Sequence, residues 1–245
     1  MKSLIVVPTL NEEDNIAKLI ARLRDLPSPP DVLVVDDSSP DKTAEIVRGI
    51  AQRDPCVRLL EREGKRSFSG SYMDGFRYAI DNGYEALVCM DADLSHNPDD
   101  VPRLIAALDK ADIVIGSRYT GRRATIVNWP LRRLILSRIS SMYVRIITGL
   151  PLTDPMAGFK AYRVDCLKHL DMDAIISQGF AFQTESVYRL FKKGARLGEV
   201  STVFTDRQVG RSKMSIKKIL EAMSMPIKLV LSVKGNNNAK NRIGK

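Results

Sequence analysis

Short apolar runs alternate with longer amphipathic stretches through the first half of the chain, and this alternation constrains the fold more than any other feature. Strands are predicted at residues 4–7, 32–35, 57–60, 86–90 and 113–115, and helices at about 12–25, 41–53, 70–82 and 98–109. Strands that are apolar throughout are buried on both faces, and the helices between them join parallel strands by right-handed crossovers. The sequence therefore predicts an α/β fold whose mostly parallel sheet is flanked by helices.

The loops that follow the strands are the expected place of a ligand site, because such sheets bind ligands beyond the carboxyl ends of their strands. The first loop, PTLNEEDN at 8–15, lacks the Gly-x-Gly-x-x-Gly motif of dinucleotide-binding folds, and its polar residues fit a helix cap as well as a ligand contact. The second strand ends on Asp36 and Asp37. One aspartate there would serve as a cap, but two indicate that at least one meets a ligand amide, a ribose hydroxyl or a base edge.

The fourth strand runs directly into Asp91-Ala92-Asp93. In extended backbone, residues two apart share a face, so the two carboxylates point the same way. Their repulsion is costly unless a cation joins them, and Mg²⁺ or Mn²⁺ binds one or two protein carboxylates and takes its other ligands from water and substrate phosphates. A divalent metal site is therefore predicted at this strand end. In the loop after the third strand, Lys65 is a weaker candidate for a phosphate contact.

Basic residues are concentrated in two regions. Between Asp112 and Asp154 there are seven arginines, with no lysine and no acid: Arg118, Arg122, Arg123, Arg132, Arg133, Arg138 and Arg145. The planar fork of arginine suits phosphate, so this window predicts phosphate recognition more than a solvated surface. Residues 207–245 hold ten Lys or Arg and one acid, so the whole formal net charge of +9 belongs to this end.

Contact with a membrane surface, without a membrane span, is predicted. No uncharged apolar run approaches the ~18 residues of a span, and the first apolar run is too short for a signal peptide. Residues 126–149 mix aliphatic and aromatic residues with four arginines, which favours an interfacial helix over a buried one, and 215–233 carry a second amphipathic pattern with lysines. Cys56, Cys89 and Cys166 lack metal-ligand spacing and are expected to be reduced thiols in the cytosol.

Eight motifs follow one another in unbroken order over roughly residues 4–216. They are Pro8-Thr9-x-Asn11-Glu12, Val35-Asp36-Asp37-x-Ser39-Pro40-Asp41-x-Thr43, Asp91-Ala92-Asp93-Leu94-Ser95-His96, Gly116-Ser117-Arg118-Tyr119, Trp129-Pro130-x-x-Arg133-x-x-x-Ser137, Asp154-x-x-x-Gly158-Phe159, Phe182-Gln183-x-Glu185, and FTDRQVGRSKMS at 204–215. In this order they resemble the dolichyl-phosphate (polyprenyl-phosphate) mannosyltransferases, which are GT-A-fold glycosyltransferases of family 2. One segment departs from the family: Ser67-Phe68-Ser69-Gly70-Ser71 stands where the family reads like Gly-Leu-Gly-x-Ala, which bears on loop closure near the donor.

The resemblance implies a GT-A domain over 1–213, with a nucleotide-sugar half at 1–119 and an acceptor half at 120–213, followed by a basic amphipathic tail at 214–245. It implies inverting, Mg²⁺- or Mn²⁺-dependent transfer of mannose from GDP-mannose to dolichyl or polyprenyl phosphate. UDP-glucose or another nucleotide sugar stays open as the alternative donor. The protein would lie peripherally on an anionic membrane surface, at the cytoplasmic face, alone or with a small membrane-anchoring subunit.

The resemblance also assigns site residues. The donor would contact Pro8, Leu10, Glu12, Val35, Asp37, Lys65, Asp91, Ala92, Asp93, Arg207 and Lys213; the metal would be held by Asp91, Asp93 and Gln183; the acceptor phosphate would contact Arg118, Arg133 and Ser137; and Asp91, Asp93 and Arg207 would be catalytic. Glu185 is assigned to the metal or the sugar. From its position beside the metal loop, His96 is expected to support the shape of that loop, with a further ligand as the alternative. A lipid phosphate monoester is already ionised at neutral pH, so no general base is expected.

Two other classes fit the chain less well. A haloacid-dehalogenase-type phosphatase also places Asp-x-Asp after a strand, but its nucleophile ends the first strand, where this chain has Pro8-Thr9. A nucleic-acid-binding module would explain the basic end of the chain but neither the carboxylates at the strand ends nor the balanced charge of residues 1–206. No nucleic acid partner is therefore expected.

Overall fold

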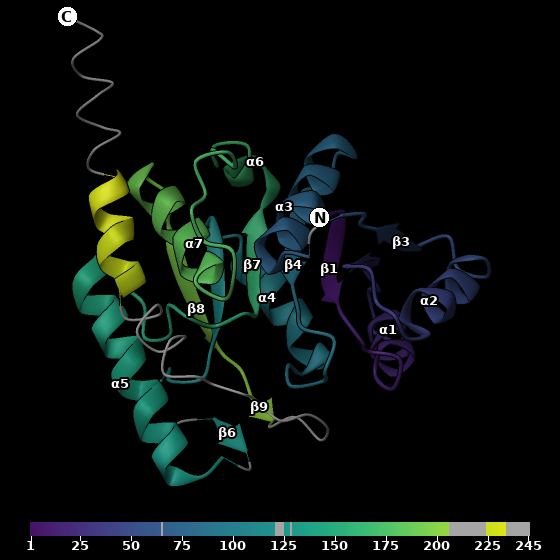
Figure 1. Ribbon diagram of the computed structural model, residues 1–245, viewed down its shortest axis with the longest axis horizontal. Coiled ribbons are helices and arrows are strands. Elements are labelled where there is room, and N and C mark those ends of the chain that lie inside the picture. Colours follow the sequence, from purple (N-terminus) through teal and green to yellow (C-terminus); the bar gives the residue numbers. More distant parts are fainter. Residues whose placement is uncertain (65, 121–124, 128, 206–223, 234–245) are drawn as a thin grey trace, which may run out of the picture.

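The computed structural model describes residues 1–64, 66–120, 125–127, 129–205 and 224–233. In it, β1 (Ser3–Thr9), which contains the first apolar run, lies inside a seven-stranded sheet (Figure 1). The strand order is β3-β2-β1-β4-β7-β5-β8. The other strands of this sheet are β2 (Asp31–Asp36), β3 (Val57–Glu61), β4 (Ala86–Cys89), β5 (Ile113–Ser117), β7 (Lys160–Arg163) and β8 (Leu197–Ser201). β6 (Ile126–Val127) and β9 (Phe204–Thr205) form a separate parallel pair.

The helices predicted for the first half of the chain are all present. They are α1 (Ile16–Arg24), α2 (Thr43–Ala51), α3 (Phe68–Asp81) and α4 (Val101–Ala107), with a 3₁₀ turn, η1 (Pro98–Asp100), before α4. Further along lie α5 (Leu131–Thr148), α6 (Val164–Leu167) and α7 (Phe182–Lys192). The five predicted strands are present as well, and each differs from the prediction only near its ends.

Two layers of core cover the two faces of the sheet. Along β1, Leu4 and Val6 belong to one apolar cluster and Ile5 and Val7 to the other, because successive side chains of a strand point to opposite faces. The first cluster includes residues of α3, α6 and α7, and the second includes residues of α1 and α4. Burial on both faces is the reason why the strand is apolar throughout.

β7 is the one strand that breaks the parallel pattern of the large sheet. It is antiparallel to β4 and to β5, while every other pair in that sheet is parallel, so the prediction of a mostly parallel sheet is confirmed. Lys160, at the beginning of β7, pairs with Cys89 at the end of β4 and with Ile115 near the end of β5. The loop that precedes β7 therefore lies at the edge of the sheet where β4 and β5 end.

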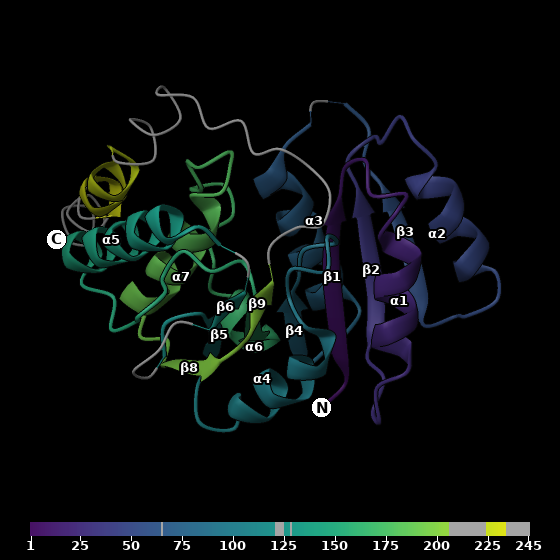
Figure 2. The same cartoon turned by 90° about the horizontal axis from the view of Figure 1, so that it is seen from below.

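α5 lies at one end of the molecule, beside the helical residues 224–233 (Figures 1 and 2). Its exposed apolar side chains are Leu131, Ile135, Leu136, Ile139, Met142 and Ile146, whereas Ser141, Val144 and Thr148 are buried. The predicted interfacial segment 126–149 thus begins with the short strand β6 and becomes helical only at Leu131. None of the helices in the described part of the chain is both long and apolar enough to cross a membrane.

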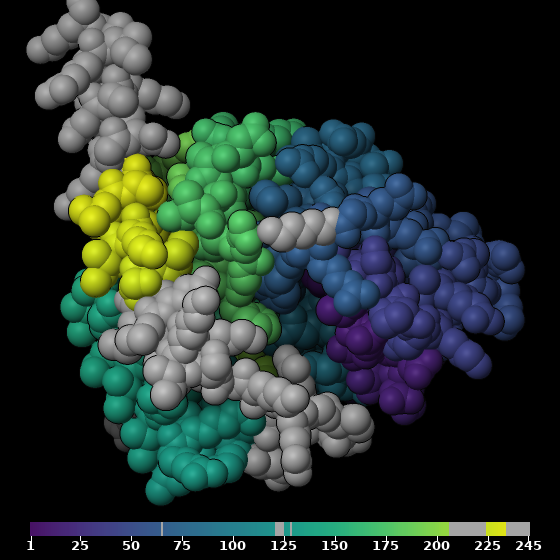
Figure 3. Space-filling model, in the orientation of Figure 1, coloured from purple at the N-terminus to yellow at the C-terminus, as the bar shows by residue number. Residues whose placement is uncertain are grey.

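Only residues 224–233 of the expected tail belong to the described part of the chain. Leu229 and Val233 pack into the apolar cluster that includes α7, while Ile227 and Leu231 are exposed. In the space-filling view the atoms of residues 224–233 (yellow) border those of α5 (teal) (Figure 3). The predicted tail residues at 214–223 and 234–245 lie outside the described residues.

Candidate active site

Three loops at the carboxyl edge of the sheet each contain one residue with left-handed backbone. Asn11 follows β1, Ser38 follows β2 and Leu94 follows β4, with φ values of 61°, 58° and 60°. Left-handed backbone at residues other than glycine costs free energy and is concentrated at functional sites. The first two loops are also joined, because the Asn11 N–H donates to Ser39 Oγ at 3.0 Å. These three loops therefore mark the candidate ligand site.

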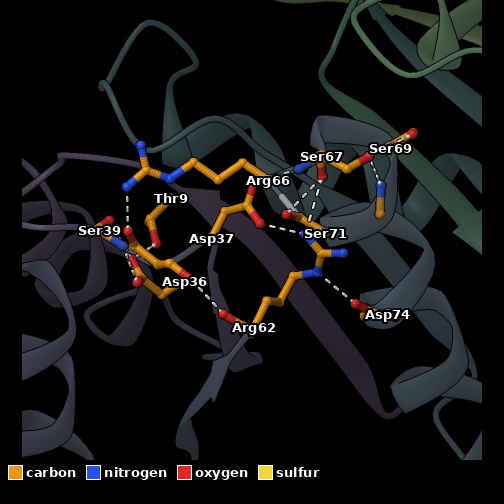
Figure 4. A network of polar contacts seen from close by, with 12 residues as sticks. Thr9, Asp36, Asp37, Ser39, Arg62, Arg66, Ser67, Ser69, Ser71 and Asp74 are labelled. Atoms are coloured by element: carbon orange, nitrogen blue, oxygen red, sulfur yellow. Dashed lines mark hydrogen bonds and ion pairs between the residues drawn. The ribbon is translucent and has the colours of Figure 1, made fainter. Parts of the chain in front are cut away.

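The two adjacent aspartates at the end of β2 have different tasks. Asp36 is buried, and its carboxylate accepts hydrogen bonds from Thr9 Oγ1 at 2.9 Å, from Ser39 Oγ at 2.6 Å and from the Ser39 N–H at 2.9 Å. Asp37 turns to the other side, where it pairs with Arg62 and accepts the Ser67 N–H at 2.7 Å (Figure 4). Asp36 thus holds the β1 and β2 loops together, and Asp37 belongs to the candidate ligand site.

Arg62, which directly follows β3, is a residue of this region that the sequence analysis missed. Its Nε donates to Asp74 at 2.7 Å while Nη1 pairs with Asp37, so the guanidinium joins the end of β2 to α3. A Cβ at residue 70 would come within 2.4 Å of the Arg62 Nη2 atom, so Gly70 leaves room for the guanidinium. The signal in the sequence was a basic residue directly after a predicted strand, at the edge already marked by Asp37.

The serine-rich departure from the family loop forms the start of α3. Ser67 is the N-cap, and its Oγ accepts the Gly70 N–H at 3.1 Å. Before it, Arg66 Nη2 donates to the Ser38 carbonyl at 2.7 Å and so connects this loop with the turn after β2 (Figure 4). The hydroxyl of Ser67 thus caps the helix, which a glycine at this position could not do because it has no side chain. Lys65, expected to contact the donor, lies outside the described residues.

The other expected donor contacts on β1, β2 and their loops differ in what they expose. Leu10 is exposed by 42%, and the Glu12 carboxylate accepts a hydrogen bond from Asn15 Nδ2 at 2.9 Å. The Val35 side chain is completely buried in the core, so the backbone of Val35 is the part available to a donor. Pro8 is half-buried within β1.

Asp91 and Asp93, the predicted metal ligands, are both half-buried directly after β4. Asp91 Oδ1 accepts a hydrogen bond from the Tyr72 hydroxyl at 3.3 Å, and Asp93 Oδ1 accepts the Ser95 N–H at 3.0 Å. The Ala92 side chain between them is buried. No group of three or more His, Cys, Asp or Glu side chains suited to a metal ion occurs among the described residues. A pair of carboxylates fits Mg²⁺ or Mn²⁺ that takes its other ligands from water and a diphosphate.

His96 supports the loop that contains the two carboxylates. Its Nδ1 accepts the Asp91 N–H at 3.2 Å, and its ring stacks on Phe159 with 5.0 Å between the ring centres. Because Nδ1 is an acceptor, the neutral ring carries its proton on Nε2. Burial lowers the pKa of His96, so the ring is neutral at physiological pH. This geometry agrees with the expected role of His96 in shaping the metal loop.

Gln183, the third predicted metal ligand, is buried near the beginning of α7 and is engaged within the protein. Its Oε1 accepts a hydrogen bond from Lys160 Nζ at 2.8 Å, and burial lowers the pKa of the Lys160 ammonium to about 7. The Gln183 Nε2 atom is buried and has no hydrogen-bond partner among the described residues. A metal at Gln183 would therefore have to share the amide oxygen with Lys160.

Glu185, which was assigned to the metal or the sugar, anchors a loop in the structure. Its carboxylate is completely buried and accepts the N–H groups of Ile176 and Ser177, at 3.0 and 2.8 Å from the nearer oxygen. Arg189 Nε donates to the same carboxylate at 2.7 Å. Both oxygens thus hold the segment before α7 in place.

Arg118, at the end of β5, is fixed by a buried carboxylate. Its Nε and Nη2 donate to the two oxygens of Asp154, at 2.6 and 2.8 Å, and the Asp154 side chain is completely buried. Asp154 is held in turn by β8, because its N–H donates to Glu199 Oε1 at 3.1 Å. This pairing leaves the guanidinium in one orientation, and Asp154 is a second residue to which the sequence analysis assigned no role.

The structure brings the three predicted acceptor residues together. Arg133 and Ser137 are one turn apart on α5, on the side opposite Leu131, Ile135, Ile139, Met142 and Ile146. The Tyr119 hydroxyl donates to Ser137 Oγ at 2.7 Å, and Tyr119 directly follows Arg118. The Arg118 and Arg133 guanidiniums both lie near the Trp129 ring, 5.7 and 4.0 Å from its centre. The predicted residues Arg207 and Lys213 lie outside the described part of the chain.

Residues 154–159, the loop before β7, contact both groups of predicted residues. At one end of the loop, Asp154 binds Arg118. At the other end, a Cβ at Gly158 would lie 3.5 Å from an Asp91 carboxylate oxygen, and Phe159 stacks on His96. Asp91 and Arg118 therefore lie at the two ends of one short loop at the edge of the sheet.

The family model described as "Glycosyl transferase family 2" matches residues 4–171 of the chain. The undecaprenyl-phosphate mannosyltransferase of Micrococcus luteus is 45% identical over 88% of this chain and 88% of its own length. The polyprenol monophosphomannose synthase of Mycolicibacterium smegmatis is 39% identical over 91% of this chain and 84% of its own length, and the dolichol-phosphate mannosyltransferase of Saccharomyces cerevisiae is 33% identical over 96% and 89%.

Solved structures of similar fold include the glucosyl-3-phosphoglycerate synthase of Mycobacterium tuberculosis in complex with Mn²⁺, UDP-glucose and glycerol 3-phosphate. That structure has a TM-score of 0.63 and 18% sequence identity, and the match covers 95% of this chain and 78% of that one. At this identity the likeness concerns the fold alone.

Proposed function

The chain belongs to glycosyl transferase family 2 and has the GT-A fold, and from this premise we propose that it transfers mannose from GDP-mannose to the phosphate of a polyprenyl or dolichyl lipid. Relatives named for mannose transfer to undecaprenyl phosphate and dolichol phosphate support the sugar and the acceptor class. The observation that carries the proposal is the loop 154–159, which lies against Asp91 at Gly158 and binds Arg118 through Asp154. A transferase needs its donor and its acceptor side by side in this way.

On the donor side, Asp37 and the β1 and β2 loops would bind the nucleoside, while Asp91 and Asp93 would hold Mg²⁺ or Mn²⁺. The metal ion, when bound, neutralises the charge that develops on the departing diphosphate. Arg62 keeps the Asp37 carboxylate in place, and His96 and Tyr72 keep Asp91 in place. All of these contacts are made within the protein itself, so they would preorganise the site for the donor.

On the acceptor side, Arg118, Arg133 and Ser137 would bind the lipid phosphate. Guanidinium groups match a phosphate by paired hydrogen bonds, and a phosphate monoester is ionised at neutral pH. The phosphate oxygen can therefore attack without a general base. Attack from the face opposite the nucleotide would invert the anomeric centre and give a β-linked mannosyl phospholipid.

The α5 helix provides a reason for a lipid acceptor. Leu131, Ile135, Ile139, Met142 and Ile146 form one exposed apolar stripe, and the opposite side of the helix carries Arg133 and Ser137. A stripe of this kind fits the surface of a bilayer, with the lipid phosphate reaching the arginines from beside the helix. We place the protein peripherally at the cytoplasmic face, on anionic lipid or with a small anchoring subunit.

The proposal is tested by supplying polyprenyl phosphate, Mg²⁺ or Mn²⁺, and labelled donor to the purified protein. GDP-mannose and UDP-glucose are offered in parallel, and the label that moves into the organic phase is counted. Transfer from GDP-mannose in preference to UDP-glucose is expected. Preferential transfer from UDP-glucose would replace the donor, and no lipid product from either donor would refute the function.

A further inference from the structure

Trp129, the only tryptophan of the chain, lies near both arginines of the proposed acceptor site. The Arg133 guanidinium is stacked over the ring, 4.0 Å from its centre, and the Arg118 guanidinium lies 5.7 Å from the same centre. Phe204 meets the ring edge to face at 5.4 Å. An aromatic face attracts a guanidinium most strongly when the ring belongs to tryptophan.

The contact is made by the ring and not by the polar atom of the indole. Trp129 Nε1 is buried and has no hydrogen-bond partner among the described residues. Another aromatic ring at this position would therefore keep the interaction with Arg133, whereas an aliphatic side chain would lose it. This distinction separates stacking from general filling of space.

The two arginines are oriented in different ways. Asp154 fixes Arg118 from β7's side of the site by two hydrogen bonds, at 2.6 and 2.8 Å. Arg133 belongs to the first turn of α5, and its guanidinium lies over the Trp129 ring. A phosphate that is bound by two guanidiniums requires both planes to be set before it arrives, because each paired hydrogen bond depends on that geometry.

We propose that Trp129 is a positioning residue that sets Arg133 against Arg118 and so forms a site for the phosphate monoester of the acceptor lipid. The inference rests on the proposed function and deepens it, because it gives a role in acceptor binding to a residue that the proposed function leaves without one. It assigns to the ring a task in acceptor binding and none in donor binding.

The first test uses the fluorescence of the intact protein, whose tryptophan emission comes from Trp129 alone. Farnesyl phosphate, farnesol and inorganic phosphate are titrated separately. Farnesyl phosphate is expected to change the emission with saturation, and farnesol is not. Equal changes with farnesol and farnesyl phosphate would overturn the inference, because the ring would then report the isoprenoid chain instead of the phosphate.

The second test compares Trp129→Phe with Trp129→Leu. The leucine variant is expected to raise KM for the acceptor by about tenfold with KM for the donor unchanged, since the contact of a cation with an aromatic ring is lost. The phenylalanine variant should recover most of that loss. If both variants behave alike, or if KM for donor and acceptor rises equally, Trp129 fills space only and the inference fails.

The two tests also separate this inference from the proposed function. If farnesyl phosphate changes the emission but no sugar transfer is found with any donor, the phosphate site stands and the assigned reaction is wrong. If transfer occurs but the emission is silent and Trp129→Leu keeps a normal KM for the acceptor, the reaction stands and the role of Trp129 is wrong.

Discussion

The completely buried Asp154 carboxylate accepts two hydrogen bonds from the Arg118 guanidinium, from Nε at 2.6 Å and from Nη2 at 2.8 Å. Arg118 extends from the end of β5, and Asp154 stands in the loop before β7. The pair thus links two neighbouring strands at the edge of the sheet where the proposed acceptor residues lie. Removing either charge would leave the other without compensation in a buried place.

Asp154→Asn is therefore expected to lower the free energy of unfolding by about 3–5 kcal/mol, the usual cost of breaking a buried pair. It should also raise KM for the acceptor phosphate more than KM for the donor. Urea denaturation and steady-state kinetics measure the two effects. Asp165→Asn, which removes the exposed partner of Lys168, is the matched control and should leave the unfolding midpoint in place. An unchanged midpoint in Asp154→Asn would contradict the importance of the pair.

Asp93→Asn is expected to reduce kcat by about a hundredfold or more, because charge stabilisation by a metal ion is worth several kcal/mol. Asparagine keeps the oxygen that accepts the Ser95 N–H, so the fold should persist. Activity with and without a chelator, and thermal unfolding, are the measurements. Asp99 is exposed and lies in η1, the 3₁₀ turn that follows this loop, so Asp99→Asn should remain active. Activity of the native chain that survives the chelator would exclude the metal role.

Ile139→Glu is expected to weaken binding to anionic liposomes severalfold, since it places a charge in the middle of the apolar stripe of α5. Lys110→Gln changes the net charge by the same amount at an exposed position after α4 and serves as the control. Flotation with liposomes at low and high salt separates apolar from electrostatic attraction. Equal binding by the native chain and Ile139→Glu would remove α5 from the membrane contact.

Alkylation of Cys166 should depend strongly on pH. Burial raises the pKa of this thiol to about 11, and the thiolate is the reactive form, so the rate at pH 8 is expected to be low and to rise until about pH 11. Above pH 9 the unfolded thiol loses its proton before the folded one, so stability falls as the pH rises through this range. Mass spectrometry of the alkylated peptide measures the rate. A rate at pH 8 equal to that of an unfolded peptide would contradict this assignment.

The apolar strands and the helices between them were predictable because their pattern is local. Leu4 to Val7 must be buried on both sides, and no distant residue is needed to infer this. β7 was not predictable in the same way, because KAYR is a mixed run whose burial comes from insertion between β4 and β5. Its lysine, Lys160, is buried by that insertion and by nothing in its own segment.

The carboxylates at the ends of β2 and β4 were also predictable from their positions after buried apolar runs, whereas Arg62 after β3 was missed. What the pattern left open was the partner of each charge. Asp36 holds two loops together, Asp37 pairs with Arg62 and Arg118 pairs with Asp154, and these partners are distant in the sequence. Glu185 illustrates the limit, because a motif position assigned to a ligand turns out to anchor a loop.

The reversed direction of β7 has a mechanical consequence. A strand that is hydrogen-bonded on both sides is stiff, and the loop before it is tethered directly to that stiff support. The distance between the sugar to be transferred and the oxygen that receives it would then be set by the sheet around β7, and not by a closing movement. Ligands of different size would have to adapt to this fixed distance between the two sites, because the distance would not change to accommodate them.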